Sequence, residues 1–154
     1  MKILVLSDSH GASDLMERIL WANESCDLVF FLGDGYMDWN IISSHIIRQG
    51  TLAVRGNCDS VLSKLPWNAV EQIEDVRTYI THGWQEHVKY GMSYLVAAAR
   101  ENGCSLALFG HTHEQYEDYI DGVRLFNPGA VSRGDYGVAE IRGGNILLTH
   151  RHVL

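Results

Sequence analysis

The chain of 154 residues is 46% hydrophobic and 20% charged, which is typical of a folded globular domain and excludes disorder, collagen and coiled coil. Its formal net charge of −7, without any Lys/Arg cluster, argues against sequence-independent nucleic-acid binding. The apolar runs are far shorter than the ~20 residues that a membrane span needs, and the run that follows Met1-Lys2 is too short for a signal peptide. We therefore expect one cytoplasmic domain over residues 1–154, with no membrane association.

The first half of the sequence alternates strand patterns with helix patterns. The continuous apolar run at residues 3–7 predicts a strand that is buried on both faces. Ser13 is expected to cap a helix, because apolar residues follow it at helical spacing. Residues 28–32 and 51–54 predict two more strands, and residues 38–47 predict a second helix. This alternation favours a mostly parallel sheet.

The second half places strands in quick succession around one helix, at residues 91–101. Asp-Gly at 121–122 and Gly-Gly at 143–144 are typical of two-residue hairpin turns. The strands predicted here are residues 70–73, 78–81, 106–109, 116–120, 123–126, 138–141 and 146–148. A parallel first half and an antiparallel second half together favour an α/β fold of two stacked sheets flanked by helices.

Polar residues that can bind a metal ion follow five of the predicted strands. They are Asp8, His10, Asp34, Asn57, His82, His111 and His113. In α/β sheets, ligands bind beyond the carboxyl ends of strands, so short loops can bring all seven side chains together. Gly, Asp and Asn favour turns on their own account. Turn preference does not explain the four histidines, however, and we interpret the set as a metal site.

The chemistry of these side chains constrains the ion. Carboxylate, imidazole and amide ligands without thiolate suit Mn, Fe, Zn, Co or Ni, of which we expect manganese. Seven ligands exceed what one ion with an open position uses, so two divalent ions are expected. Two ions and only two carboxylates, Asp8 and Asp34, leave a positive site that favours a phosphate anion.

The polar blocks resemble the signature blocks of the calcineurin-like metallophosphoesterases, and most closely those of the small single-domain phosphodiesterases of bacteria and archaea. The resemblance spans residues 1 to about 134 and rests on Asp8-Ser9-His10, Gly33-Asp34, Gly56-Asn57-Cys58-Asp59, Thr81-His82-Gly83, Gly110-His111-Thr112-His113 and the turn Asn127-Pro128-Gly129. It implies a four-layer α/β/β/α sandwich of two stacked mixed sheets with a dinuclear metal site.

The same resemblance implies how the ligands divide. Asp8, His10 and His113 would hold one ion, while Asn57, His82 and His111 would hold the other. Asp34 would bridge the two ions. A hydroxide bridging both metals would then hydrolyse a small phosphoester substrate, with a phosphodiester favoured over a monoester.

Several catalytic roles stay open at this point. Asn57 and His111 are expected to contact the phosphate as well. Cys58 stands where many members of the superfamily carry a histidine that protonates the leaving group, and a thiol beside metal ions is a poor acid. Asp59 is the next candidate for the acid, or it only orients His10 or caps a turn. Arg133 either reaches an outer phosphate oxygen or is a solvated surface residue.

The rival interpretation is a protein-interaction scaffold, because a subunit of the eukaryotic retromer has this fold with a weakened metal site. This chain keeps four site histidines and two carboxylates, which favours an enzyme. Trp39, Trp67 and Trp84 lie near the motif loops and either line the site or pack in the core. A homo-oligomer also stays open.

Overall fold

The fold is given by a computed structural model that describes residues 1–45 and 47–153. Residue 46 of the predicted helix 38–47, and residue 154 at the end of the predicted domain, lie outside the described residues. In chain order the elements are β1 (Lys2–Leu6), α1 (Ser13–Ala22), β2 (Leu28–Phe31), α2 (Tyr36–His45), β3 (Gly50–Ala53), the 3₁₀ helix η1 (Val61–Ser63), β4 (Asn68–Ile73), β5 (Val76–Thr81), α3 (Ser93–Glu101), β6 (Leu106–Leu108), β7 (Gln115–Ile120), β8 (Val123–Pro128), the 3₁₀ helix η2 (Val131–Arg133), β9 (Asp135–Arg142) and β10 (Asn145–His152).

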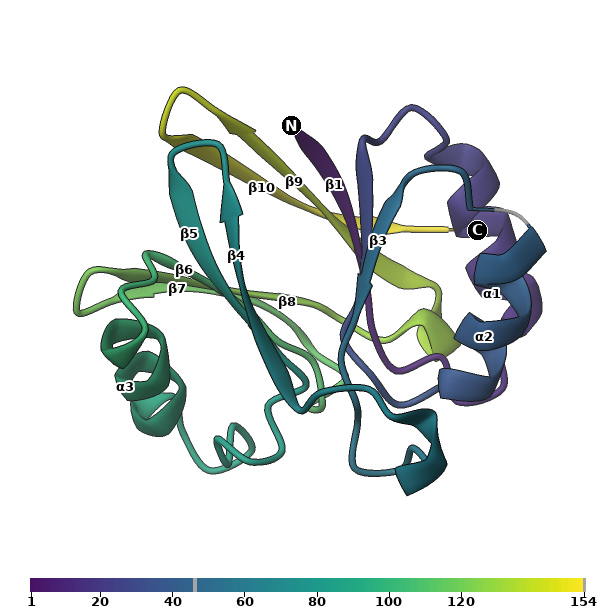
Figure 1. Cartoon of the computed structure of the whole chain (residues 1–154), viewed down its shortest axis with the longest axis horizontal. Coiled ribbons are helices and arrows are strands. Elements are labelled where there is room, and N and C mark those ends of the chain that lie inside the picture. Colours follow the sequence, from purple (N-terminus) through teal and green to yellow (C-terminus); the bar gives the residue numbers. More distant parts are fainter. Residues whose placement is uncertain (46, 154) are drawn as a thin grey trace.

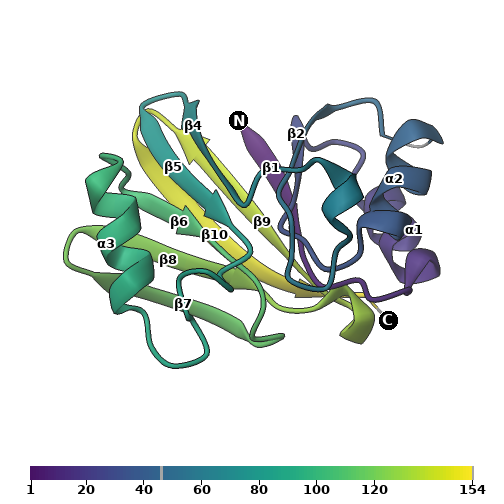
Figure 2. The ribbon, with the colours of Figure 1, turned by 60° about the horizontal axis from the view of Figure 1, so that its bottom comes forward.

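Two five-stranded sheets stack on one another, with α1 and α2 outside the first sheet and α3 outside the second (Figures 1 and 2). The first sheet has the order β10-β9-β1-β2-β3 and the second β4-β5-β6-β8-β7. All ten predicted strands are present, and the four-layer α/β/β/α sandwich of mixed sheets is confirmed. The expectation of an antiparallel second half is confirmed for β4–β5, β7–β8 and β9–β10 but was wrong for β5, β6 and β8, which pair in parallel. Strand β9 returns to the first sheet, where it pairs with β1.

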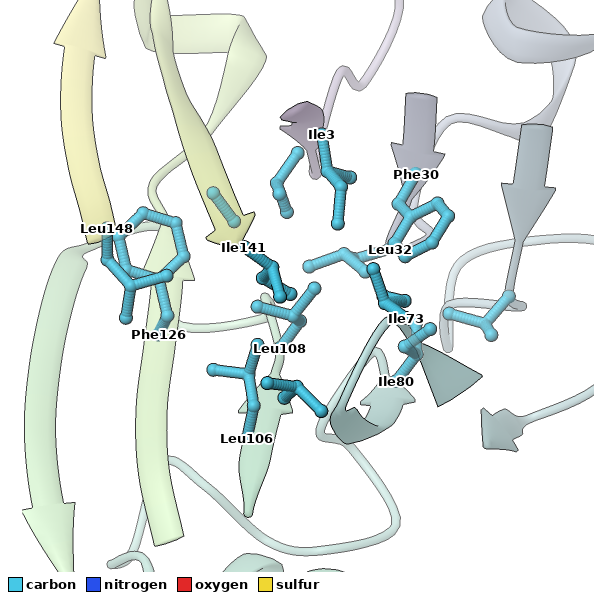
Figure 3. Close-up of a cluster of buried hydrophobic side chains, with 14 residues drawn as sticks. Ile3, Phe30, Leu32, Ile73, Ile80, Leu106, Leu108, Phe126, Ile141 and Leu148 are labelled. Atoms are coloured by element: carbon cyan, nitrogen blue, oxygen red, sulfur yellow. The ribbon is translucent and has the colours of Figure 1, made fainter. Parts of the chain in front are cut away.

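The core explains why the β1 sequence is a continuous apolar run. Ile3 and Val5 point between the two sheets, where they join Phe30, Leu106 and Phe126 in the cluster of Figure 3. Leu4 and Leu6 point the other way and pack beneath α1 and α2. Both faces of the strand are therefore buried, as the sequence predicts. A third apolar cluster lies between α3 and the second sheet.

The helix starts differ from the sequence prediction. Ser13 does not cap α1 but is its first residue, because the Ala12 carbonyl already accepts the first helical hydrogen bond, from Met16 N–H at 3.1 Å. Helix α2 begins at Tyr36, two residues before the predicted start. Its first N–H groups are satisfied by a carboxylate from a distant loop, that of Asp59, which no local sequence signal reveals.

The two predicted hairpin turns are confirmed by their backbone angles. Asp121 and Gly122 have φ of +49° and +84°, and Gly143 and Gly144 have φ of +54° and +78°, as a two-residue turn of the I′ type requires. Within the described residues, no helix is long and apolar enough to cross a membrane. The loops after β1, β2, β3 and β5 gather at one end of the sandwich, the lower end in Figure 1.

Candidate metal centre

The seven predicted ligands come from five loops that meet at this end of the molecule. Asp8 and His10 follow β1, Asp34 follows β2, Asn57 follows β3 and His82 follows β5. His111 and His113 lie between β6 and β7. The side chains form two groups of three with nearby ligand atoms: an open triad of Asp8, His10 and His113, and a buried triad of Asp34, His82 and His111.

The open triad faces solvent. The side chains of His10 and His113 are 33% and 32% exposed, and their Nε2 atoms lie 3.1 Å apart. Both nitrogens approach the same carboxylate oxygen, Asp8 Oδ1, at 3.6 Å and 3.1 Å. Two imidazole nitrogens and a carboxylate oxygen that converge in this way form a suitable site for a divalent cation.

The buried triad is held more firmly. His82 is 1% exposed, and its Nδ1 lies 2.7 Å from the carbonyl oxygen of Leu32. A hydrogen bond from Nδ1–H to this carbonyl leaves Nε2 free to bind a metal ion. Nε2 lies 3.3 Å from Asp34 Oδ2 and 3.1 Å from Asn57 Oδ1, so Asn57 adjoins this triad as expected.

The contacts of the Asp8 carboxylate show whether a cation fits this site. Its Oδ2 accepts hydrogen bonds from the Ser7 hydroxyl at 2.5 Å and from His111 N–H at 3.1 Å. Its Oδ1 is buried and makes no hydrogen bond with the described residues. An unsatisfied buried carboxylate oxygen is costly. The three histidine nitrogens around it can share a cation with it, so the residues present fit a metal ion.

The charges of the site act strongly on one another. Burial raises the pKa of Asp8, but His10, His113 and His82 outweigh burial and hold that pKa well below its usual range. Burial, followed by the electrostatic effect of His82 and Lys89, lowers the pKa of His111 to about 4. His111 is therefore neutral near pH 7, which is the form that binds metal ions.

The backbone at the ligands is unusual. Asp8, His10, Asp34, His111 and His113 all have left-handed conformations, with φ of +56°, +44°, +58°, +70° and +61°. Residues other than glycine rarely adopt this region, although Asp and His tolerate it better than most. Five such residues in one place mark a site whose loops are held by the surrounding structure.

Two motif glycines let these loops pack against each other. A Cβ atom on Gly56 would lie 2.0 Å from Asp34 Oδ1, and one on Gly110 would lie 2.0 Å from the Ser7 hydroxyl and 2.8 Å from Asp8 Oδ2. Neither distance is possible for real atoms. Glycine is required at both positions because another loop, carrying a ligand, occupies the space of the side chain.

Asp59 does not point its carboxylate at the ligands. One oxygen accepts N–H groups of Gly35 and Tyr36 at 2.9 Å, and the other accepts those of Asp34 and Gly56 at 2.9 Å and 2.8 Å. The side chain thus ties the loop of Asp34 to its own loop and stabilises the start of α2. The sequence offered a capping role as an alternative, but not this partner.

Cys58 lies at the edge of the site. Its backbone N–H donates to Asp34 Oδ1 at 2.8 Å. Its exposed thiol lies close enough to the ligand atoms of His10 and Asp34 for all three to reach one metal ion. The same residues border a cleft of about 340 Å³ that extends towards Tyr36 and Met37. His10 of the open triad and Asp34 of the buried triad both line this cleft.

Arg133 and Trp39, which the sequence offered as possible site residues, have different surroundings in the structure. Arg133 Nη1 donates to the His113 carbonyl at 3.1 Å and to Glu114 at 2.9 Å, so this side chain is engaged in holding the loop of His113. Trp39 packs in the core against Phe31. The sequence analysis missed two groups that support the site, the Ser7 hydroxyl bound to Asp8 and the Leu32 carbonyl bound to His82. Ser7 could have been suspected, because it is a polar residue at the end of an apolar strand. Nothing in the sequence indicates the role of the Leu32 carbonyl.

Comparison with known proteins agrees with this geometry. The sequence profile of the calcineurin-like phosphoesterase superfamily domain matches residues 1–141. Phosphodiesterase YfcE of Escherichia coli is 30% identical over 155 aligned positions, which cover 86% of this chain and 80% of that protein. A probable metallophosphoesterase of Mycoplasma pneumoniae is 29% identical over 138 positions, covering 84% of this chain and 79% of that one.

Among solved structures, Vps29 of Chaetomium thermophilum has the same fold, with a TM-score of 0.79 at 16% identity over 98% of this chain and 97% of that one. At that identity the likeness concerns the fold alone. The profile match and the curated relatives go further, and this chain belongs to the calcineurin-like phosphoesterase superfamily, as a metal-dependent hydrolase of phosphoester bonds.

Proposed function

We propose that this phosphoesterase acts on phosphodiesters and holds two divalent ions, one in each triad, with Asp34 between them. The observation that carries the proposal is the position of Asp34 Oδ2. This oxygen lies 3.8 Å from His10 Nε2 in the open triad and 3.3 Å from His82 Nε2 in the buried triad. One carboxylate that faces histidines of both triads is what a shared ligand requires.

Two ions at these positions would lower the pKa of a water molecule to supply hydroxide and would neutralise charge on the phosphate. The protein supplies the geometry. The Asn57 side chain directs Oδ1 to His82, while its Nδ2 lies 3.4 Å from the Cys58 thiol at the exposed edge of the site. We propose that Asn57 Nδ2 and the His111 ring contact the phosphate oxygens.

A diester is preferred over a monoester because of charge. A diester carries one negative charge and a monoester up to two. Arg133 is the side chain that could have neutralised the second negative charge of a monoester, but it forms an ion pair with Glu114. The name of the Escherichia coli relative, a phosphodiesterase, supports the same preference.

An alkoxide leaving group then needs a proton from outside the protein. Asp59 has both oxygens occupied by four N–H groups and is buried, so we propose it as a positioning residue rather than as the acid. Cys58 does not supply the proton efficiently beside metal ions. Solvent water is the remaining donor.

Hydrolysis after metal removal tests the proposal. The protein is stripped with a chelator, reloaded with Mn²⁺, and assayed with bis(p-nitrophenyl) phosphate and p-nitrophenyl phosphate. We expect turnover only after reloading, and a higher kcat/KM for the diester. Higher activity on the monoester would refute the diester preference. A protein that binds Mn²⁺ but hydrolyses neither ester would support the scaffold interpretation.

A further inference from the structure

Two ligand loops meet a second time outside the metal centre, through aromatic rings. The first meeting is the 3.1 Å approach of His82 Nε2 to Asn57 Oδ1. In the second, the rings of Trp67 and Trp84 stack with centroids 5.6 Å apart and planes 20° apart. The guanidinium of Arg55, two residues before Asn57, lies 4.4 Å from the Trp67 ring centroid. Trp84 is two residues from His82 in the sequence, so the stack lies on a loop that also carries a member of the buried triad.

The loop that carries Trp84 is anchored firmly. Glu86 is buried and accepts hydrogen bonds from the hydroxyls of Tyr79 at 2.9 Å and Thr81 at 3.0 Å. Val88 is also buried, and its N–H donates to the Gly83 carbonyl at 3.2 Å. Trp84 lies between Gly83 and these anchors, which hold its backbone, and the stack on Trp67 positions its ring.

Despite this anchoring, Trp84 remains 47% exposed. A stacked ring that is held rigidly and still open to solvent presents aromatic surface at a small entropic cost of binding. One cation lies at the stack, the Arg55 guanidinium against the Trp67 ring. An aromatic surface with a cation beside it, next to a phosphate site, suits an anion that carries a planar group.

We infer that Trp84 is a specificity-determining residue that stacks on a planar ester group of the phosphodiester substrate, so that nucleoside phosphodiesters are preferred over aliphatic ones. This inference rests on the proposed phosphodiesterase function and deepens it. Trp67 supports the Trp84 ring from one side, and the nucleobase takes the exposed surface. The phosphate would then be held at the two triads, whose member His82 is two residues before Trp84 in the sequence.

The test compares two substrates with the same five-membered phosphodiester ring, with and without a base. Kinetics with the Mn²⁺-loaded protein are measured on adenosine 2′,3′-cyclic phosphate and glycerol 1,2-cyclic phosphate. Trp84→Leu keeps apolar contact with Trp67 but removes the stacking surface, and Trp84→Phe restores part of it. Trp21→Leu is the matched control, because Trp21 is 55% exposed at the C-terminal end of α1, whereas the candidate ligands lie in the loops that follow strands.

We expect Trp84→Leu to lower kcat/KM about 5- to 100-fold for the adenosine substrate, the range that loss of base stacking gives, with little change for the glycerol substrate. Trp84→Phe should recover part of the loss and Trp21→Leu should have no effect. Equal loss on both substrates, or no loss on either, would overturn the inference.

A binding measurement separates this inference from the proposed function. Calorimetric titration of the Mn²⁺-loaded protein with adenosine 5′-monophosphate and ribose 5-phosphate needs no turnover. Tighter binding of the adenosine compound that disappears in Trp84→Leu supports stacking, even if neither cyclic diester is hydrolysed and the proposed function fails. Equal affinity of the wild-type protein for both compounds overturns the inference while leaving phosphodiester hydrolysis intact.

Discussion

The open triad and the buried triad contain the same ligand types, one carboxylate and two imidazoles, but the fold supports them differently. In the buried triad, the Leu32 carbonyl fixes His82 and a neighbouring amide, that of Asn57, extends the ligand set. In the open triad, His10 and His113 are each about one third exposed and lie against one another. Preorganisation should therefore make the buried triad the tighter metal site and the open triad the site of exchange.

The largest effect is expected from removing what the two triads share. Asp34→Asn takes away the charge of the oxygen that faces both triads, and hydrolysis should fall below detection. Elemental analysis of the reloaded, desalted protein should show about two ions per chain in the wild type and fewer in the variant. Asp75→Asn, in an exposed turn, is the matched control. Unchanged metal content in Asp34→Asn would contradict the shared-ligand assignment.

The next prediction separates the triads. His82→Ala leaves the Leu32 carbonyl unpaired in the interior, so the metal-free protein should lose about 1–3 kcal/mol of unfolding free energy. His10→Ala removes a partly exposed ring and should change that free energy by less than about 0.5 kcal/mol. Urea denaturation of both metal-free variants checks this difference. Equal destabilisation would mean that the two triads are equally embedded in the fold.

Asp59 allows the positioning role to be separated from acid catalysis. Asp59→Asn leaves one side-chain oxygen for four N–H groups, so the loops of Asp34 and Gly56 should loosen. We expect hydrolysis of nitrophenyl and alkyl diesters to slow by the same factor, together with weaker Mn²⁺ binding. A general acid would instead show a loss confined to the alkyl ester, of about 10²–10⁴-fold. Kinetics on both esters, with metal content measured, decide between the two roles.

Cys58 should give the smallest effect. Its thiol is at the exposed edge, and the proposed chemistry requires no protein nucleophile. Cys58→Ser should keep hydrolysis within about 2- to 3-fold of the wild type, as expected for a substitution at the surface. A steady-state assay with metal content determined in parallel checks this. Loss of hydrolysis with both ions retained would show that the thiol takes part in the reaction.

The sequence predicted the strands and the gathering of the seven polar side chains at one sheet end, because both leave local patterns. Apolar runs such as residues 3–7 mark buried strands, and polar residues just after them mark the sheet end where ligands gather. Contacts between distant loops leave no such pattern. The capping of α2 by Asp59, the pairing of Arg133 with Glu114 and the return of β9 to β1 each depend on tertiary structure. The predicted cap at Ser13 failed for a related reason, since the preceding turn sets where α1 begins.

The left-handed backbone of five candidate ligand residues implies a trade-off between stability and function. If each costs about 1 kcal/mol, the low end for strained residues, the metal centre subtracts roughly 5 kcal/mol from a domain whose net stability is typically about 5–15 kcal/mol. Two full sheets with three apolar clusters are then needed to keep these loops in place. We expect that the seven candidate ligands cannot be transplanted to a smaller scaffold as side chains alone, because that scaffold must also offset the free energy that their left-handed backbone costs.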